Sequence, residues 1–249
     1  MRFARDGLRE MLISTFLFGG GAAIFIWLGW SVYWAWYIPA VPLLAVWIFT
    51  LAFFRDPDRA IPTAPGLMVS PADGKVTEVA VVNSHEGIDG PAVKISIFLS
   101  VFNVHVNRMP CAGRVLKTDY RAGEFLDARH PECGIRNESN TLVLDPQESA
   151  LGGKGNGAKN PVIIRQVAGL IARRIICKLR PGDVVARGQR LGMIKFGSRT
   201  DLIVAVASGL EPAVKVNDVV YGGETVIMRQ AGAPIAAQSG RVAEKQACL

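Results

Sequence analysis

Gly197 and Ser198 place a hydroxyl group directly after a residue that has no side chain, within the segment Phe196-Gly197-Ser198. Cleavage of a backbone by its own serine needs this pair of residue types, because the serine oxygen must reach the carbonyl carbon of the preceding residue. Glycine leaves that carbonyl unshielded and its dihedral angles free, and a strained turn would raise its energy further. Gly-Ser pairs are also common in ordinary turns, so the dipeptide alone favours a plain turn.

Self-cleavage also needs a group that moves protons, and the chain has three histidines. The near-neutral ordinary pKa of histidine suits His105 to this role. Alternation along a strand would put Asn103, His105 and Asn107 on one face, where they would form the polar wall of a pocket. The spacing leaves open a plain core or surface histidine. His85 and His130 lie in loop-like segments and are interpreted as surface residues.

The cysteines and the net charge narrow the choice of partners. The four cysteines show no CxxC pair and no zinc-ligand spacing, so we expect ordinary thiols and no metal site. The net charge of +7, from 28 basic and 21 acidic residues, suits anionic partners such as lipid headgroups or nucleic acid. Charge alone does not choose between them. Basic residues beside an apolar segment favour anionic membrane lipids, and we expect no nucleic-acid partner.

The N-terminal part of the chain is strongly apolar and has no Asp, Glu, Lys or Arg from Met11 to Phe54. Because a helix needs roughly 20 apolar residues to cross a bilayer, we predict a transmembrane hairpin with helices at about 11–30 and 38–54. These helices would form an N-terminal membrane segment, residues 1–60, with an aromatic belt near the turn. A single span is the alternative. Arginines on both flanks place the rest of the chain on the cytoplasmic side of the cell (inner) membrane.

Residues 61–249 change to short β-rich runs separated by Gly, Pro, Asn and Asp, which predicts a mainly β (α+β) catalytic domain. The expected strands lie at 75–82, 92–99, 140–145, 161–169, 173–179 and 201–207. The Asp-Val-Val of residues 183–185 recurs at residues 218–220, and each copy is followed by a glycine turn and a further strand. This pattern is typical of the barrel-sandwich folds of lipoyl and biotinyl carriers. A carrier would present a lysine where this chain has Lys-Phe-Gly-Ser-Arg-Thr-Asp, so a membrane-anchored carrier module is an alternative.

Several stretches, in the same order, resemble the short, prokaryote-type phosphatidylserine decarboxylases from about Arg55 to Val226. The matching stretches are FFRDPDRAIP (53–62), VSPADGKV (69–76), IFLSVFNVHVNRMPCAG (97–113), NES (137–139), RQVAGLIARRI (165–175), PGDVVARGQRLGMIKFGSRTDL (181–202) and VKVNDVVYGGETV (214–226). So many stretches in the family's order do not arise by chance.

The resemblance implies how Ser198 acts. Its Oγ attacks the Gly197 carbonyl to give an ester, and β-elimination then leaves one fragment of residues 1–197 and one of residues 198–249. The new end of the second fragment is a dehydroalanine, which hydrolyses to a pyruvoyl group. The pyruvoyl ketone forms a Schiff base with the amine of phosphatidylserine and accepts the electron pair released as carbon dioxide leaves. Protonation and hydrolysis release phosphatidylethanolamine, without a metal or an external cofactor.

The resemblance also implies roles for other residues. His105 matches the family's histidine, and Asp73 resembles a carboxylate that orients a histidine, although Asp-Gly is also a standard hairpin turn. Arg108 stands where longer members carry a second histidine. Arginine is not a base at neutral pH, so it is open whether His105 serves self-cleavage, decarboxylation or both. Arg108 and Phe196 are candidates for substrate binding, Arg108 through its bidentate fork.

The expected partners are phosphatidylserine, anionic membrane lipids and the two fragments themselves, which would form a heterodimer; a higher homo-oligomer is left open. A pyruvoyl decarboxylase of another amino acid or serine lipid is a further alternative. The membrane helices favour a lipid substrate, and the resemblance alone chooses the headgroup.

Overall fold

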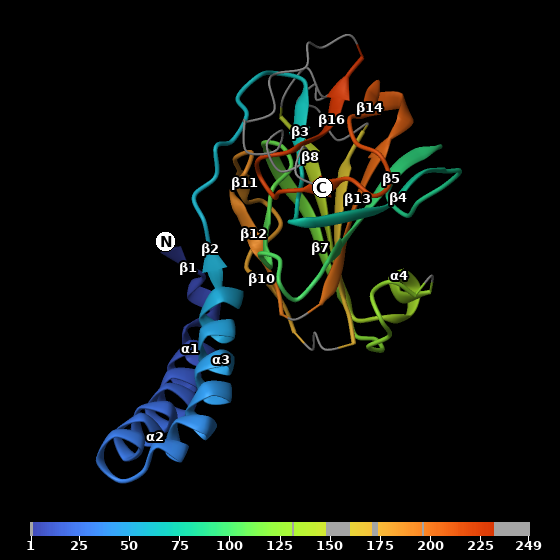
Figure 1. The fold of residues 1–249 in the computed structure, drawn as a ribbon. Helices are drawn as coiled ribbons and strands as arrows, with labels where there is room; N and C mark the ends of the chain where they lie inside the picture. Colours follow the sequence, from blue (N-terminus) through green and yellow to red (C-terminus); the bar gives the residue numbers. More distant parts are fainter. Residues whose placement is uncertain (1, 131, 148–159, 171–173, 196, 232–249) are drawn as a thin grey trace. The chain divides into compact units, whose positions relative to one another are not determined.

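The computed structural model describes residues 2–130, 132–147, 160–170, 174–195 and 197–231 (Figure 1). The chain divides into two compact units, residues 1–58 and residues 59–249. The first unit is mainly helical and the second is mainly β.

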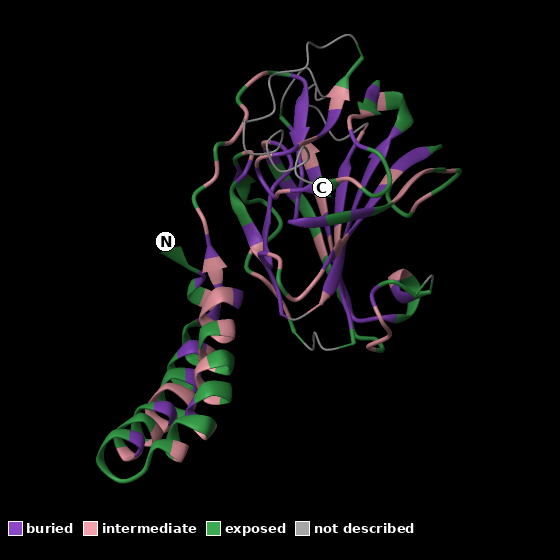
Figure 2. Cartoon of the chain, in the orientation of Figure 1, coloured by how far each residue is buried: buried purple, intermediate pink, exposed green. Residues whose placement is uncertain are grey.

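Two apolar helical stretches make up the first unit, Arg5–Ser31 and Trp34–Phe53. Each is long and apolar enough to cross a membrane, and most of their side chains are not buried in the protein (Figure 2). The predicted helical pair is therefore confirmed. Its elements are η1 (Arg5–Gly7), α1 (Leu8–Ser14), the π-helical turn η2 (Thr15–Gly19), α2 (Gly20–Ser31), η3 (Trp34–Trp36) and α3 (Tyr37–Phe53).

Short contacts join the two helical stretches to each other. The indole Nε1 of Trp47 donates a hydrogen bond to Thr15 Oγ1 at 3.0 Å. At the other end of the pair, β1 (Arg2–Phe3) and β2 (Arg55–Asp56) form a two-stranded antiparallel sheet. The two chain ends of the helical hairpin are therefore paired with each other.

The second unit is built on a curled antiparallel sheet of eight strands, in the order β11-β7-β8-β9-β13-β5-β4-β15. The strands are β4 (Gly74–Val82), β5 (Ala92–Leu99), β7 (Gly113–Arg121), β8 (Ser139–Pro146), β9 (Val162–Ala168), β11 (Val184–Val185), β13 (Ser198–Ala205) and β15 (Val219–Val220). Strand β13 pairs with β5 on one side and β9 on the other, and all its residues are buried. Burial on both faces explains its nearly continuous apolar sequence after Asp201.

Two three-stranded sheets cover the inner face of this curled sheet. One has the order β10-β12-β6, with β6 (Val106–Arg108), β10 (Ile175–Cys177) and β12 (Arg190–Ile194). The other has the order β14-β16-β3, with β3 (Leu67–Val69), β14 (Leu210–Pro212) and β16 (Val226–Gln230). The remaining described elements are the short helix α4 (Cys133–Arg136) and the turn η5 (Val206–Ser208).

The main apolar core lies between these sheets. It joins Ile97 and Leu202 of the large sheet to Leu191 of one small sheet and Met68 and Met228 of the other. The mainly β prediction is therefore confirmed, and each strand expected from the sequence overlaps a strand of the structure.

The recurring Asp-Val-Val segments lie at opposite edges of the large sheet and pair in the same way. Val220 of β15 is opposite Gly74 of β4, and Val185 of β11 is opposite Gly113 of β7. The sequence echo therefore corresponds to a structural repeat.

Reciprocal hydrogen bonds join the two copies of this repeat. The backbone N–H of Val69 donates to the Pro110 carbonyl, and the N–H of Arg108 donates to the Pro71 carbonyl, each at 2.9 Å. The segment Pro-Ala-Asp-Gly-Lys at residues 71–75 thus corresponds to Pro-Cys-Ala-Gly-Arg at residues 110–114.

Candidate active site

The Gly197–Ser198 bond lies at the entrance to the central strand of the large sheet. Ser198 is the first residue of β13, opposite Leu99 on one neighbour and Ala168 on the other. Gly197 has φ +61°, in the left-handed region that disfavours residues with a Cβ. A residue held in this conformation directly before a strand provides the turn that the sequence led us to expect.

The carbonyl of Gly197 packs against a second glycine. A Cβ added to Gly169 would collide with the Gly197 carbonyl oxygen, whereas one added to Gly197 would have its nearest neighbour at 3.9 Å. Gly169 follows β9, the strand beside β13. The missing side chain at residue 169 therefore leaves room for the carbonyl that Ser198 would attack.

His105 lies against the same peptide. Its Nδ1 is 3.0 Å from the Asn103 carbonyl oxygen, and the Gly197 N–H donates to its Nε2 at 3.2 Å. Because a carbonyl only accepts, Nδ1 carries the proton in this arrangement and Nε2 holds the lone pair. His105 is fully buried, and its basic nitrogen lies one residue away from the candidate nucleophile.

The Ser198 hydroxyl is fully buried and has no hydrogen-bond partner among the described residues. A buried hydroxyl without a partner is energetically unfavourable. No hydrogen bond within the described residues would therefore have to break before this hydroxyl reacts.

Asp73 lies in the turn between β3 and β4 and is held by ionic contacts. Its Oδ2 accepts from Arg59 at 2.6 Å, and its Oδ1 accepts from the Gly222 N–H at 2.7 Å. A second arm of Arg59 donates to Glu224 at 3.1 Å. All three charged side chains are nearly buried, so they depend on one another for charge neutralisation.

Arg108 is buried in the same region as Asp73. Its guanidinium donates to the Gly188 carbonyl at 3.1 Å. Its aliphatic stem lies next to Gly223, the residue after the Gly222 whose N–H donates to Asp73. The structure thus brings Asp73 and Arg108 to the Tyr221–Glu224 turn, while His105 and Ser198 meet at residue 197. Phe196 lies outside the described residues.

A chain of buried amides and one hydroxyl supports β13 next to Ser198. Asn140 donates to Gln166 at 3.1 Å, and Gln166 donates to Asn107 at 2.8 Å. Asn107 in turn donates to Thr200 at 3.2 Å. Since Thr200 is two residues from Ser198, it lies on the same face of β13.

The polar wall expected from alternation across residues 103–107 forms only in part. His105 and Asn107 are buried, but Asn103 is only half-buried and lies in a turn, where its side chain accepts from the Ser100 N–H at 2.9 Å. Strand β6 begins only at Val106. The local turn bond therefore takes Asn103 away from the site.

The other candidates lie elsewhere. His85 lines a separate pocket and His130 is exposed. Cys133 and Cys177 are free thiols whose pKa values are raised by burial. No cluster of metal-ligating side chains occurs within the described part of the chain.

Three residues that the sequence did not single out take part in this arrangement: Arg59, Gly169 and Gln166. All lie inside the stretches that matched the family, but residue type alone did not mark them. From the sequence, Arg59 is interpreted as a charge that flanks the membrane segment, and Gln166 and Gly169 belong to the expected strand at 161–169.

Comparisons with known proteins decide the family. The phosphatidylserine decarboxylase family model matches residues 46–228. The chain belongs to this family. A phosphatidylserine decarboxylase proenzyme of Rhodopirellula baltica is 42% identical over 227 residues, which cover 91% of this chain and 88% of the relative. One of Carboxydothermus hydrogenoformans is 42% identical over 231 residues, covering 92% and 96%.

One of Desulfotalea psychrophila is 45% identical over 179 residues, covering 72% of this chain and 78% of the relative. This chain is therefore a decarboxylase of the phosphatidylserine decarboxylase family. The relatives are named as proenzymes, which describes precursors that are processed. The matched range spans Asp73, His105, Gly197 and Ser198.

Proposed function

We propose that this protein converts phosphatidylserine to phosphatidylethanolamine and carbon dioxide, using a pyruvoyl group made from Ser198 by self-cleavage at Gly197–Ser198. The observation that carries the proposal is the meeting of His105 Nε2, the Gly197 peptide and the buried, unpartnered Ser198 hydroxyl. Family membership supports the decarboxylase activity.

Self-cleavage needs a base next to the hydroxyl and an accessible carbonyl. His105 Nε2 would accept the Ser198 proton as Oγ bonds to the Gly197 carbonyl carbon. The Gly197–Ser198 C–N bond then breaks, the Ser198 nitrogen leaves as an amine that takes the proton from His105, and Gly197 remains attached to Ser198 through an ester. Loss of the Ser198 Cα proton then expels the Gly197 carboxylate and leaves a dehydroalanine at residue 198. Water hydrolyses this dehydroalanine to the pyruvoyl ketone and releases its nitrogen as ammonia.

Residues of the chain would then bind the substrate and transfer a proton. When formed, the pyruvoyl group supplies an electron sink for decarboxylation. His105 is placed to hold or return a proton at its Nε2, beside the position of residue 198. Arg108 is our candidate for binding the substrate's carboxylate or phosphate, and Phe196 for a further substrate contact. We propose that Asp73 holds the turn on which Arg108 packs.

The sheet explains how the two fragments would stay together as a heterodimer. Cleavage before Ser198 leaves β13 hydrogen-bonded to β5 and β9, both of which belong to the other fragment. The smaller fragment also supplies β16, which pairs with β3. Separation would therefore break the centre of the large sheet and expose its apolar core.

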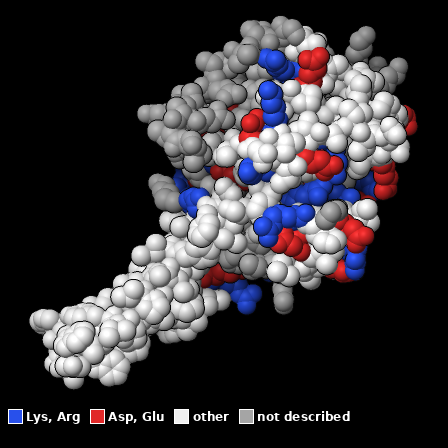
Figure 3. Space-filling view, turned by 45° about the vertical axis from the view of Figure 1, so that its right-hand side comes forward, with Lys and Arg blue, Asp and Glu red and all other residues white. Residues whose placement is uncertain are grey.

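We also propose that the helical pair anchors the enzyme in the cell (inner) membrane, with the β unit on the cytoplasmic side. The lipid substrate and the outward-facing apolar helices support an anchor. Figure 3 shows an almost uncharged surface over the helices and mixed charges over the β unit. The flanking arginines support the orientation and contacts with anionic lipids.

A denaturing gel tests the self-cleavage. We expect wild-type protein to separate into fragments of 197 and 52 residues (249 − 197 = 52) instead of one 26.9 kDa chain. Ser198→Ala should remain uncut and inactive, and His105→Ala should lose processing, decarboxylation or both. Ser84→Ala, in an exposed loop, is the matched control and should behave as wild type. Cleaved Ser198→Ala protein would rule out Ser198 as the nucleophile.

Product analysis tests the substrate. Processed enzyme should release carbon dioxide from phosphatidylserine in mixed micelles, and phosphatidylethanolamine should appear in equal amount. Free serine or phosphoserine should not replace the lipid. Turnover of these soluble amines at the rate of the lipid would favour a pyruvoyl enzyme of another substrate class.

A further inference from the structure

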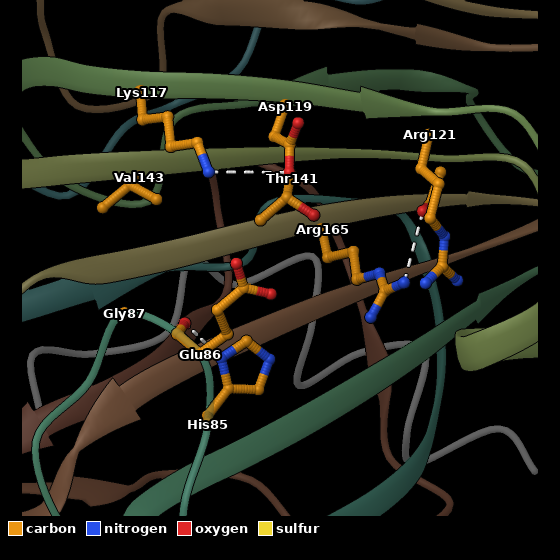
Figure 4. Close-up of a pocket in the computed structure, with 10 residues that line it drawn as sticks. His85, Glu86, Gly87, Lys117, Asp119, Arg121, Thr141, Val143 and Arg165 are labelled. Carbon is orange, nitrogen blue, oxygen red and sulfur yellow. Dashed lines mark hydrogen bonds and ion pairs between the residues drawn. The ribbon is translucent and has the colours of Figure 1, made fainter.

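A pocket of about 240 Å³ opens on one face of the large sheet (Figure 4). Side chains alternate between the faces of a strand. Gln166 lies on the inner face with Thr200 and Ser198, so Arg165 points to the outer face, where it lines the pocket. The pocket is therefore distinct from the proposed active site.

The pocket wall comes from three adjacent strands and one loop. β7 contributes Lys117, Asp119 and Arg121, β8 contributes Ser139 and Thr141, and β9 contributes Arg165. The loop segment 85–87 closes the remaining side. Three basic side chains thus lie around one small space, together with two hydroxyl groups.

Two of these basic groups lack an anionic partner. Lys117 pairs with Asp119 at 3.6 Å, but within the described part of the chain no carboxylate lies within ion-pair distance of Arg121 or Arg165. Arg165 donates to Ser139 at 3.2 Å, and its Nε is buried without a partner.

The two guanidinium groups also repel each other. The pKa of Arg165 is lowered by burial and then by the charge of Arg121. Asp201 acts in the opposite direction, but Arg199 holds it at 2.6 Å. Figure 4 shows the Arg121 and Arg165 side chains converging at one end of the pocket. An anion bound between the two guanidinium groups would offset this repulsion.

We propose that this pocket binds a phosphate group, held between Arg121 and Arg165 and by the hydroxyl groups of Ser139 and Thr141. Planar guanidinium forks match phosphate oxygens in pairs, which makes arginine well suited to this recognition. The phosphate is either free in solution or part of a lipid headgroup. Glu86 also lines the pocket, and its carboxylate weakens the attraction without removing it.

Calorimetric titration of the full chain in neutral detergent micelles with inorganic phosphate tests this proposal. Wild type should bind phosphate saturably in the millimolar range. Arg121→Gln should weaken binding about tenfold or more, because it removes a charge-assisted pair of hydrogen bonds to the phosphate. Arg114→Gln removes the same charge from an exposed site on the same strand and should have no effect. Glu86→Gln should strengthen binding several-fold.

Phosphatidic acid added to the same micelles identifies the source of the phosphate. Displacement of inorganic phosphate in wild type assigns the site to a lipid headgroup, and no displacement assigns it to free phosphate. Absent saturable binding, or equal losses in Arg121→Gln and Arg114→Gln, would overturn the proposal. The gel assay is independent of it, because Arg121 is exposed on the opposite face and its variant should still be processed.

Discussion

At the scale of single residues, the Gly197 carbonyl depends on an absent side chain elsewhere. Gly197 itself has a left-handed conformation, and Gly169 leaves the space that the Gly197 oxygen occupies. Ser198 supplies the proposed nucleophile, but its attack requires this carbonyl to stay in place. Positioning therefore rests on glycines as much as on the residues that react.

Gly169→Ala should slow self-cleavage by about tenfold or more. The new methyl group overlaps the Gly197 oxygen, and overpacking of this kind costs about 1–3 kcal/mol, where about 1.4 kcal/mol corresponds to a factor of ten in rate. The rate of fragment formation after synthesis measures the effect. Gly134→Ala is the control, because its nearest neighbour lies at 3.7 Å. Wild-type processing in Gly169→Ala would show that the carbonyl does not need this space.

Which site residues can be predicted from the sequence depends on how each of them acts. Gly197, Ser198 and His105 are predicted because the stretches around them resemble the family, whereas their residue types alone left a plain turn and a plain histidine open. Gly169 acts by lacking volume and Arg59 by meeting Asp73 across the fold. Such roles depend on pairings between distant segments, which local patterns do not contain.

At the scale of elements, the two copies of the repeat differ at a residue that the turn itself does not require. Asp73 in the first copy corresponds to Ala112 in the second, and both turns lead into a strand that begins with glycine. The turn therefore does not require a carboxylate. Asp73 is instead explained by its contacts with Arg59 and Gly222, which fix the segment next to Arg108.

The strands themselves were largely predictable, since β-rich runs between Gly, Pro, Asn and Asp mark their positions. Their order in the sheet was not, because β13 lies between β5 and β9 through long-range pairing. The expected strand across residues 103–107 failed at Asn103, where a side-chain bond to Ser100 favours a turn.

The amide chain below β13 gives an element-scale prediction. Asn107→Leu removes the acceptor of the Gln166 amide N–H and the donor to Thr200 Oγ1, at about 1–3 kcal/mol for each buried group left unsatisfied. The urea midpoint should fall and self-cleavage should slow, because Thr200 and Ser198 share a face of β13. Asn83→Leu, in an exposed loop, is the matched control. An Asn107→Leu midpoint equal to that of Asn83→Leu would contradict a supporting role for the amide chain.

At the scale of the whole molecule, the two units differ in the environment that their surfaces suit. The helices present apolar side chains outward, whereas the β unit buries its apolar residues between sheets. All five tryptophans of the chain lie in the helical unit, so tryptophan fluorescence reports on this unit alone. This distribution allows a direct test of whether the helices span the bilayer or lie along its surface.

Two variants that each keep one tryptophan of the second helical stretch should report different depths in lipid vesicles. Trp34 begins this stretch and Trp47 lies 13 residues further, or about 20 Å along a helix axis. In a spanning helix, bromine atoms deep in the acyl chains should quench Trp47 more strongly than Trp34, which lies at the interface. The other tryptophans become phenylalanine, so the apolar surface is preserved. Equal quenching of both positions by shallow bromines would instead place the helix flat in the interface, because only a helix parallel to the surface holds both residues at one depth.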